Sequence, residues 1–172
     1  MVSQRRVEFE SDGVRDSLTG VLAPASFLEI LGNELHVAAR EKRAVTVISI
    51  RLTAMQQVLT QAIASHCAEI PTDPIKYQSD VALHEELLKS FAHQLSTLIR
   101  RGDYCARIAE DGFWVLTRGD ICSAQIATKR YLLELDPMDW SLAYHQSNAG
   151  QSDTPESMRQ LLQRMDALHF TK

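Results

Sequence analysis

The chain has 172 residues, 45% of them hydrophobic and 23% charged, with a formal net charge of −4. This is the length of one ordinary globular domain. A mildly acidic composition argues against a main role in binding DNA or RNA, because phosphates are held by clustered lysine and arginine. No apolar run is long enough to span a bilayer, and the first residues lack the apolar core of a secretory signal. The three cysteines form no CxxC pair, so we expect a cytoplasmic domain with free thiols.

The first third of the chain predicts two helices around a strand. Apolar spacing predicts a helix that begins with Ser26 as its cap. The β-branched run 45–50 predicts a buried strand, and a weak apolar stripe predicts a second helix over residues 54–67. Two prolines and several polar residues predict that residues 69–80 form a loop.

The middle of the chain predicts a long helix followed by a β-hairpin. The helix has seven apolar residues on one face and ends at Gly102, after two arginines. Two short apolar runs, 104–108 and 113–117, flank four residues of turn character and predict the hairpin. We expect Gly112 to provide the conformational freedom of its turn.

The last third predicts a helix, a strand and a final helix. Asp120 is a suitable cap for the first of these helices, residues 140–145 predict a strand, and Thr154-Pro155 predicts the start of the last helix. The order of elements predicts an α/β fold with one central mixed sheet, which contains the hairpin and is flanked by helices.

Several segments resemble, in the same order, those of GGDEF domains, which make cyclic di-GMP from two GTP molecules. Asp16-Ser-Leu-Thr-Gly20 resembles the D-x-L-T-G segment that opens these domains. Residues 107–113, Arg-Ile-Ala-Glu-Asp-Gly-Phe, match the hairpin with the Gly-Gly-Asp-Glu-Phe motif. Residues 95–103 resemble the family's long helix with its R-x-x-D ending, and residues 165–170 its closing A-D-x-A-L-Y pattern. The resemblance implies a fold of the nucleotidyl-cyclase or palm type.

The resemblance also implies a division of the chain. Residues 16–172 would form the GGDEF-like domain and residues 1–15 a short leader. No stretch of this sequence matches the segment with which the family recognises the guanine base. The connector at about residues 69–80 lies in its place. This connector would be longer than the family's by about fifteen residues, a length usual for functional loops.

The resemblance implies that the chemistry of the family is degenerate here. The name motif is matched by Ala109, Glu110, Asp111, Gly112 and Phe113. Arg51 stands where the family has a metal-ligating aspartate, and an arginine repels a cation. Glu110 would repel a triphosphate, and a Cβ at its position limits the approach of the backbone. We therefore expect no catalytic residues, no metal ligands and no cofactor, and we interpret Glu110 and Asp111 as a solvated hairpin turn.

One binding pattern of the family is intact. Arg100-Arg101-Gly102-Asp103 matches the R-x-x-D site at which GGDEF domains bind cyclic di-GMP as an inhibitor. A guanidinium pairs with a phosphate or with the O6/N7 edge of guanine, and a carboxylate accepts from the N1–H and N2–H₂ edge. We expect Arg100 and Asp103 to point outward, with Arg101 adding charge. The alternative is an ordinary surface pair of arginine and aspartate at a helix end.

Three functions remain open from the sequence. The first is a catalytically inactive receptor for cyclic di-GMP. The second is a nucleotide-independent module that binds a protein partner in a signalling complex or forms a homodimer, through the connector or the altered hairpin turn. The third is an active diguanylate cyclase with unusual ligands. None of them requires nucleic acid or membrane insertion by this chain.

Overall fold

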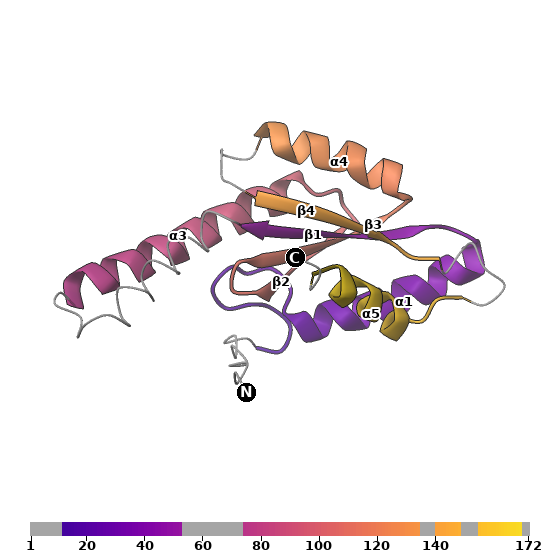
Figure 1. Ribbon diagram of the computed structural model, residues 1–172, viewed down its shortest axis with the longest axis horizontal. Coiled ribbons are helices and arrows are strands. Elements are labelled where there is room, and N and C mark those ends of the chain that lie inside the picture. Colours follow the sequence, from indigo (N-terminus) through magenta and orange to yellow (C-terminus); the bar gives the residue numbers. More distant parts are fainter. Residues whose placement is uncertain (1–11, 53–73, 135–139, 149–154, 170–172) are drawn as a thin grey trace.

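The computed structural model describes residues 12–52, 74–134, 140–148 and 155–169, and the side chains within them except 74–81, 132–134 and 166–169. The elements in chain order are α1 (Pro24–Glu41), β1 (Val45–Leu52), α3 (Pro74–Leu98), β2 (Tyr104–Ala109), β3 (Gly112–Arg118), α4 (Ile121–Glu134), β4 (Trp140–Gln146) and α5 (Met158–His169). Figure 1 shows one sheet with α3 and α4 on one face and α1 and α5 on the other. The predicted α/β fold with a hairpin is confirmed.

The sheet has the strand order β2-β3-β1-β4. All three of these pairings are antiparallel, so the expectation of a mixed sheet was wrong in this respect. Outside the named strands, Leu22 and Ala106 form an isolated parallel bridge. The apolar runs predict where strands lie but not their relative direction, because a buried strand can have the same composition beside a parallel or an antiparallel neighbour.

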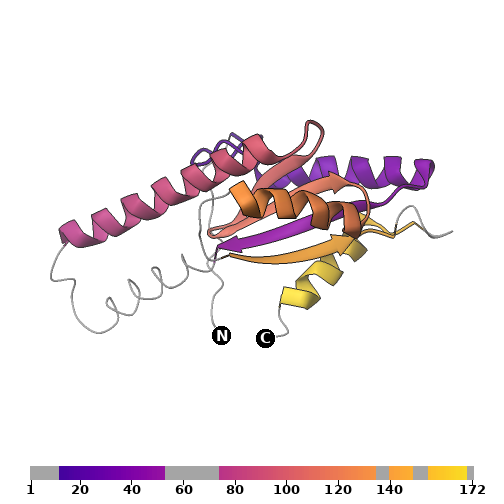
Figure 2. The ribbon, with the colours of Figure 1, turned by 90° about the horizontal axis from the view of Figure 1, so that it is seen from above.

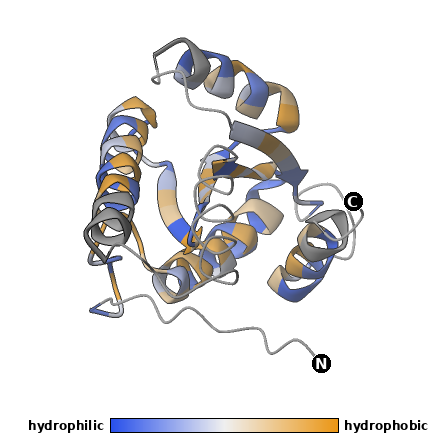
Figure 3. Cartoon of the chain, turned by 60° about the vertical axis from the view of Figure 1, so that its left-hand side comes forward, coloured by the Kyte–Doolittle hydropathy of each residue, from blue (hydrophilic) through white to orange (hydrophobic). Residues whose placement is uncertain are grey.

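The central strand β1 is buried on both faces, which explains its continuous apolar run. Alternate residues of a strand point to opposite faces. Ile48, Ile50 and Leu52 share a core cluster with α3 and α4, whereas Val45 and Val47 share a second cluster with α1 and α5. Figure 3 shows the apolar sides of the helices turned toward the sheet. The predicted strand at 45–50 is confirmed and extends to Leu52.

Helices α1 and α5 begin at residues other than those predicted. Helix α1 starts at Pro24, with Ala23 as a cap that makes no side-chain hydrogen bond. Ser26 therefore lies inside the helix, where its hydroxyl donates to the Gly13 carbonyl over 2.8 Å. Proline suits a first turn because its missing N–H has no helical partner there. Helix α5 starts after Ser157 rather than at Pro155; the Ser157 hydroxyl and the Gln160 side chain form a capping box.

Helix α3 begins earlier than predicted. Residues 74–80, which we expected in a loop, are its first residues. Pro74 is compatible with this position because proline favours the first turn of a helix. The predicted helix at 54–67 and residues 69–73 of the predicted connector lie outside the described residues. Figure 2 shows that the N-terminal half of α3 extends well beyond the sheet.

The hairpin between β2 and β3 is confirmed. Ala109 pairs with Gly112 across the turn, and a register irregularity separates this pair from Arg107. Gly112 does not adopt a positive φ, so the turn does not use the freedom that we expected of it. Among the described helices, none has both the length and the apolar character needed to cross a membrane.

Candidate functional site

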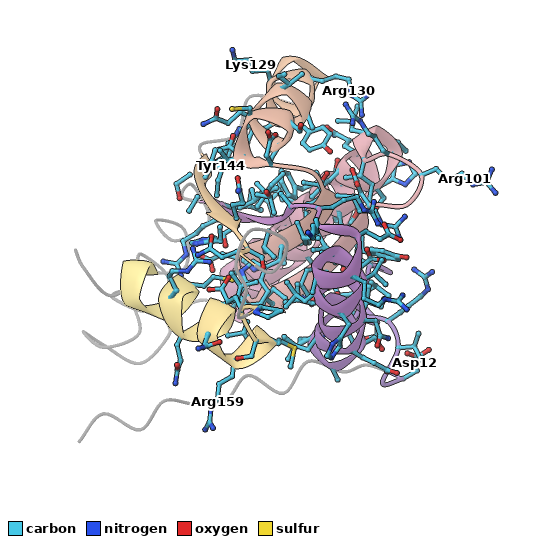
Figure 4. All side chains as sticks on the ribbon, turned by 90° about the vertical axis from the view of Figure 1, so that its right-hand side faces the viewer. Asp12, Arg101, Lys129, Arg130, Tyr144 and Arg159 are labelled. Carbon is cyan, nitrogen blue, oxygen red and sulfur yellow. The ribbon has the colours of Figure 1, made fainter. Side chains whose placement is uncertain are left out.

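The R-x-x-D segment forms a tight turn between α3 and β2. The amide of Asp103 donates to the Arg100 carbonyl over 2.9 Å. Gly102 has φ 104°, a conformation that glycine adopts without strain. The turn brings the first and last residues of the motif together, with Arg100 and Arg101 exposed and Asp103 partly buried. Figure 4 shows Arg101 reaching from this turn into solvent.

The carboxyl group of Asp103 is turned more toward the protein than expected. Burial raises its pKa, while hydrogen bonds from the Thr117 side chain and from the Arg100 backbone oppose the increase. Its Oδ2 atom is buried and has no hydrogen-bond partner among the described residues. The expectation that Arg100 and Asp103 both point outward is therefore wrong for Asp103. Because this oxygen is closed off from solvent, Asp103 must turn its side chain before it can accept a hydrogen bond from a ligand.

Helix α4 adds a further arginine at this corner, which the sequence reading missed. Arg130 donates from Nη2 to the carbonyl of Leu98, at the C-terminal end of α3. Its guanidinium also lies 5.7 Å from the centroid of the Tyr131 ring. Burial, followed by the charge of Asp103, raises the pKa of Tyr131 to about 12. No local pattern joins α4 to the turn, so only the fold places Arg130 there (Figure 4).

The altered name motif occupies the tip of the hairpin. Glu110 is exposed, as expected of a solvated turn. Asp111 is only 8% exposed, so the same interpretation was wrong for it. Its carbonyl accepts from the Leu52 amide over 2.9 Å, which ties the tip to the end of β1. Phe113 is fully buried, with its ring 5.2 Å from that of Phe91.

Arg51, at the position that the family resemblance assigns to a metal ligand, lies beside the hairpin tip. Arg51 pairs with Gly112 in the sheet, and its Nε atom lies 4.0 Å from Oδ2 of Asp111. One guanidinium beside one carboxylate does not fit a divalent cation, which needs several converging oxygens. In the part of the chain that the structure describes, no group of three or more His, Cys, Asp or Glu side chains is placed to hold a metal ion.

The D-x-L-T-G segment packs against the hairpin through a buried ion pair. Arg107 Nη1 lies 3.6 Å from Oδ1 of Asp16. The other carboxylate oxygen accepts from both the amide and the hydroxyl of Thr19, over 2.9 and 2.5 Å. Arg107 also donates from Nη2 to the Glu110 carbonyl over 3.0 Å. These contacts fix the opening segment and the hairpin relative to each other.

A buried histidine lies close to the same hairpin. His84 of α3 is 9% exposed, and neither ring nitrogen has a hydrogen-bond partner among the described residues. Burial lowers its pKa, and the charge of Glu110 opposes this effect. The six histidines show no metal-ligand spacing, so no pattern in the chain distinguishes His84 from the others.

Comparisons with known proteins add evidence at the level of structure only. No family model matches the sequence, and no curated protein matches it. Solved structures do match. The GGDEF domain of DgcB from Caulobacter crescentus, in complex with c-di-GMP, has a TM-score of 0.67 at 12% identity, covering 92% of this chain and 88% of that one. The FimX GGDEF domain from Pseudomonas aeruginosa has a TM-score of 0.65 at 14% identity, covering 89% of each chain.

A third match is the diguanylate cyclase SiaD from Pseudomonas aeruginosa, solved with its activator SiaC. It has a TM-score of 0.66 at 18% identity, covering 89% of this chain and 55% of that one. The fold of this chain thus defines an α/β domain, in which an antiparallel sheet that contains the hairpin is covered by helices. More specifically, the chain has the fold of GGDEF domains.

Proposed function

We propose that this chain is a catalytically inactive GGDEF-type domain that binds cyclic di-GMP through Arg100, Arg101 and Asp103. The observation that carries the proposal is the tight turn that joins the backbone of Arg100 to that of Asp103, with Arg101 between them. Its hydrogen bond between the Asp103 amide and the Arg100 carbonyl closes the segment, and both arginines are exposed.

The chemistry of the turn suits a guanine nucleotide with phosphodiester groups. Arg100 can pair with a phosphate or with the O6/N7 edge of guanine. Asp103 supplies a half-buried carboxylate, which accepts from the N1–H and N2–H₂ edge once its side chain has turned toward the ligand. Arg101 adds a second positive charge near the dianionic ligand. Several of the matching GGDEF structures are described with cyclic di-GMP, which supports the choice of ligand.

The absence of catalysis is proposed from the hairpin. Phosphoryl transfer by this fold family requires divalent cations, and such cations are held by converging carboxylates. Arg51 brings a fixed positive charge to the metal position, 4.0 Å from Asp111. A cation bound there would face repulsion from the guanidinium and competition for the carboxylate.

Thermal melting tests the binding proposal. Cyclic di-GMP at one hundred times its Kd should stabilise the wild type by about 2.7 kcal/mol and raise the melting temperature. Arg100→Ala should abolish most of this shift. Arg159→Ala, which removes an exposed arginine from α5, is the matched control and should leave it unchanged. An equal shift in Arg100→Ala would refute the site.

A turnover assay tests the second half of the proposal. GTP with Mg²⁺ or Mn²⁺ should give no cyclic di-GMP above background. Product formation that is lost in Asp111→Asn would show an active cyclase and would overturn the interpretation of Arg51.

An interaction module remains the alternative function. The SiaD cyclase, which contains a domain of this fold, is described in complex with an activator protein. This alternative predicts no melting shift with cyclic di-GMP and a partner whose capture is lost on changing the exposed Glu110 at the hairpin tip.

A further inference from the structure

A second pocket lies on the sheet, away from the R-x-x-D turn. It has a volume of about 390 Å³ and is lined by β1, the two hairpin strands and β4. This volume falls in the range of small-molecule sites, which combine an apolar wall with a few converging polar groups. Its lining includes Ser49, Arg51, Gly112, Trp114, Ser141 and Ala143.

The strand register explains why this part of the sheet is hollow. Ser49 is paired with Trp114 on one side and with Ala143 on the other, and Arg51 with Gly112 and Ser141. Directly paired residues point to the same face, and this is the face that carries α1 and α5. Small residues thus form the floor, between an indole ring and a guanidinium.

Ser49 is the polar group inside this floor. Its side chain is 5% exposed, and its hydroxyl has no hydrogen-bond partner among the described residues. A buried hydroxyl without a partner costs free energy, so a ligand that accepts or donates a hydrogen bond here is favoured. The unpartnered Ser49 hydroxyl is the observation that distinguishes this pocket from an ordinary shallow depression of the surface.

Trp114 and Arg51 provide the two walls of the pocket. The Trp114 ring is held by the ring of Phe27, with centroids 5.9 Å apart, so one part of the indole is fixed while the side chain remains partly exposed. Arg51 is half-exposed, and its ion-pair partner among the described residues is Asp111, whose carboxylate is 4.0 Å away. That distance is longer than a good charge-assisted hydrogen bond, so the guanidinium can take a second anionic partner.

We propose that this pocket binds a small planar aromatic carboxylate. The Trp114 indole stacks on the aromatic ring, the Arg51 guanidinium pairs with the carboxylate, and the Ser49 hydroxyl donates to it. The pocket includes positions that the family resemblance assigns to metal and phosphate, but its chemistry is different. A fixed cation here replaces the metal ion, so the pocket favours one carboxylate over a metal-bound triphosphate.

The test uses 2-naphthoate as the probe and the neutral 2-naphthamide, of nearly the same shape, as its control. The chain has two tryptophans, so a ¹⁵N spectrum has two indole N–H signals, which Trp140→Phe assigns. Trp140 belongs to the cluster on the opposite face. We expect 2-naphthoate to shift the Trp114 signal saturably and more than the Trp140 signal, and 2-naphthamide to bind about tenfold more weakly.

Variants locate the site. Arg51→Gln should weaken 2-naphthoate about tenfold, and Ser49→Ala about threefold. Asp111→Asn should strengthen it, because the competing carboxylate is gone. Arg100→Ala and Arg159→Ala should change nothing, which separates this pocket from the R-x-x-D site. The spread of amide signals shows whether each variant is folded. If Arg51→Gln does not fold, Ser49→Val provides a second variant in which the pocket is blocked.

Three results would overturn the proposal. They are an absence of saturable binding by 2-naphthoate, equal binding of the neutral amide, and undiminished binding in a folded Arg51→Gln or Ser49→Val variant. A loss of cyclic di-GMP binding in Arg100→Ala with 2-naphthoate binding intact would support both sites independently.

Discussion

Arg107 Nη1 lies 3.6 Å from Asp16 Oδ1, and each side chain is at least 94% buried. The pair joins two motifs that are far apart in the sequence, the D-x-L-T-G segment and the hairpin. A buried charge is tolerated only when it is paired and hydrogen-bonded, and here Thr19 and the Glu110 carbonyl supply the hydrogen bonds. The pair therefore fixes the hairpin to the D-x-L-T-G segment.

Removing one partner of this pair should destabilise the fold strongly. Arg107→Met leaves the Asp16 carboxylate buried without its counter-charge, which costs about 3 kcal/mol. Urea unfolding measures the change in the free energy of unfolding. Arg101→Ala, which removes an exposed arginine, is the control and should change this free energy by no more than about 0.5 kcal/mol. A change below about 1 kcal/mol in Arg107→Met would contradict the buried-pair account.

His84 should make stability depend on pH. Burial lowers its pKa in the folded state, so the unfolded chain binds its proton at higher pH, near the ordinary value of about 6.5. Folded stability is therefore lost as the pH falls through that value toward the lowered folded pKa. Urea unfolding at several pH values should show a smaller loss in His84→Leu, whereas His36→Gln, at an exposed position, should behave as the wild type. Equal slopes in wild type and His84→Leu would exclude this role.

Arg118 should stabilise the contact between α1 and β3. Its Nε and Nη2 atoms donate to the Glu34 carboxylate over 2.8 and 2.5 Å, and this hydrogen bonding lowers the pKa of Glu34. Arg118→Ala should cost about 2 kcal/mol, because charge-assisted hydrogen bonds are lost and Glu34 stays buried. Arg118→Lys should cost less, since an ammonium keeps the charge but not the two-point geometry. Thermal unfolding ranks the stability of the two variants. A loss of stability in Arg118→Lys as large as that in Arg118→Ala would contradict a role for the two-point hydrogen bonding.

The sequence predicted what depends on local pattern and missed what depends on tertiary contact. The strand at 45–50 and the hairpin followed from apolar runs, and Asp120 was rightly assigned as a cap, with its carboxylate accepting from the Ser123 amide. Helix starts were less accessible, because Ser26 and Ser157 are equally good caps by type. Only Ser157 lies at the start of a helix, whereas Ser26 lies inside α1 and its hydroxyl donates to the Gly13 carbonyl.

The candidate sites show the same division. The order of Arg100, Arg101 and Asp103 in the sequence located the turn, but the inward position of Asp103 arises from β3 and α4 packing beside it. Asp111 could not be predicted as buried, because its neighbour Arg51 is distant in sequence and its hydrogen bond to Leu52 joins the two strands. The opposite exposures of Glu110 and Asp111 follow from this one contact.

Asp103 should give cyclic di-GMP binding a characteristic pH dependence. Burial raises its pKa above the ordinary 3.8, and only the ionised carboxylate accepts from both guanine donors. Affinity should therefore fall as the pH is lowered through this raised pKa, earlier than an exposed aspartate would allow. Asp103→Asn should bind about tenfold more weakly and with a flat profile. A wild-type profile as flat as that of the variant would remove Asp103 from the site.

A calorimetric titration of cyclic di-GMP into the wild type and into Arg100→Ala tests most directly whether this nucleotide binds at the R-x-x-D turn. The account predicts saturable heats with a Kd in the micromolar range, equivalent to about −8 kcal/mol, and their loss in the variant. Saturable heats of the same size and affinity in a folded Arg100→Ala, or none in the wild type, would contradict it.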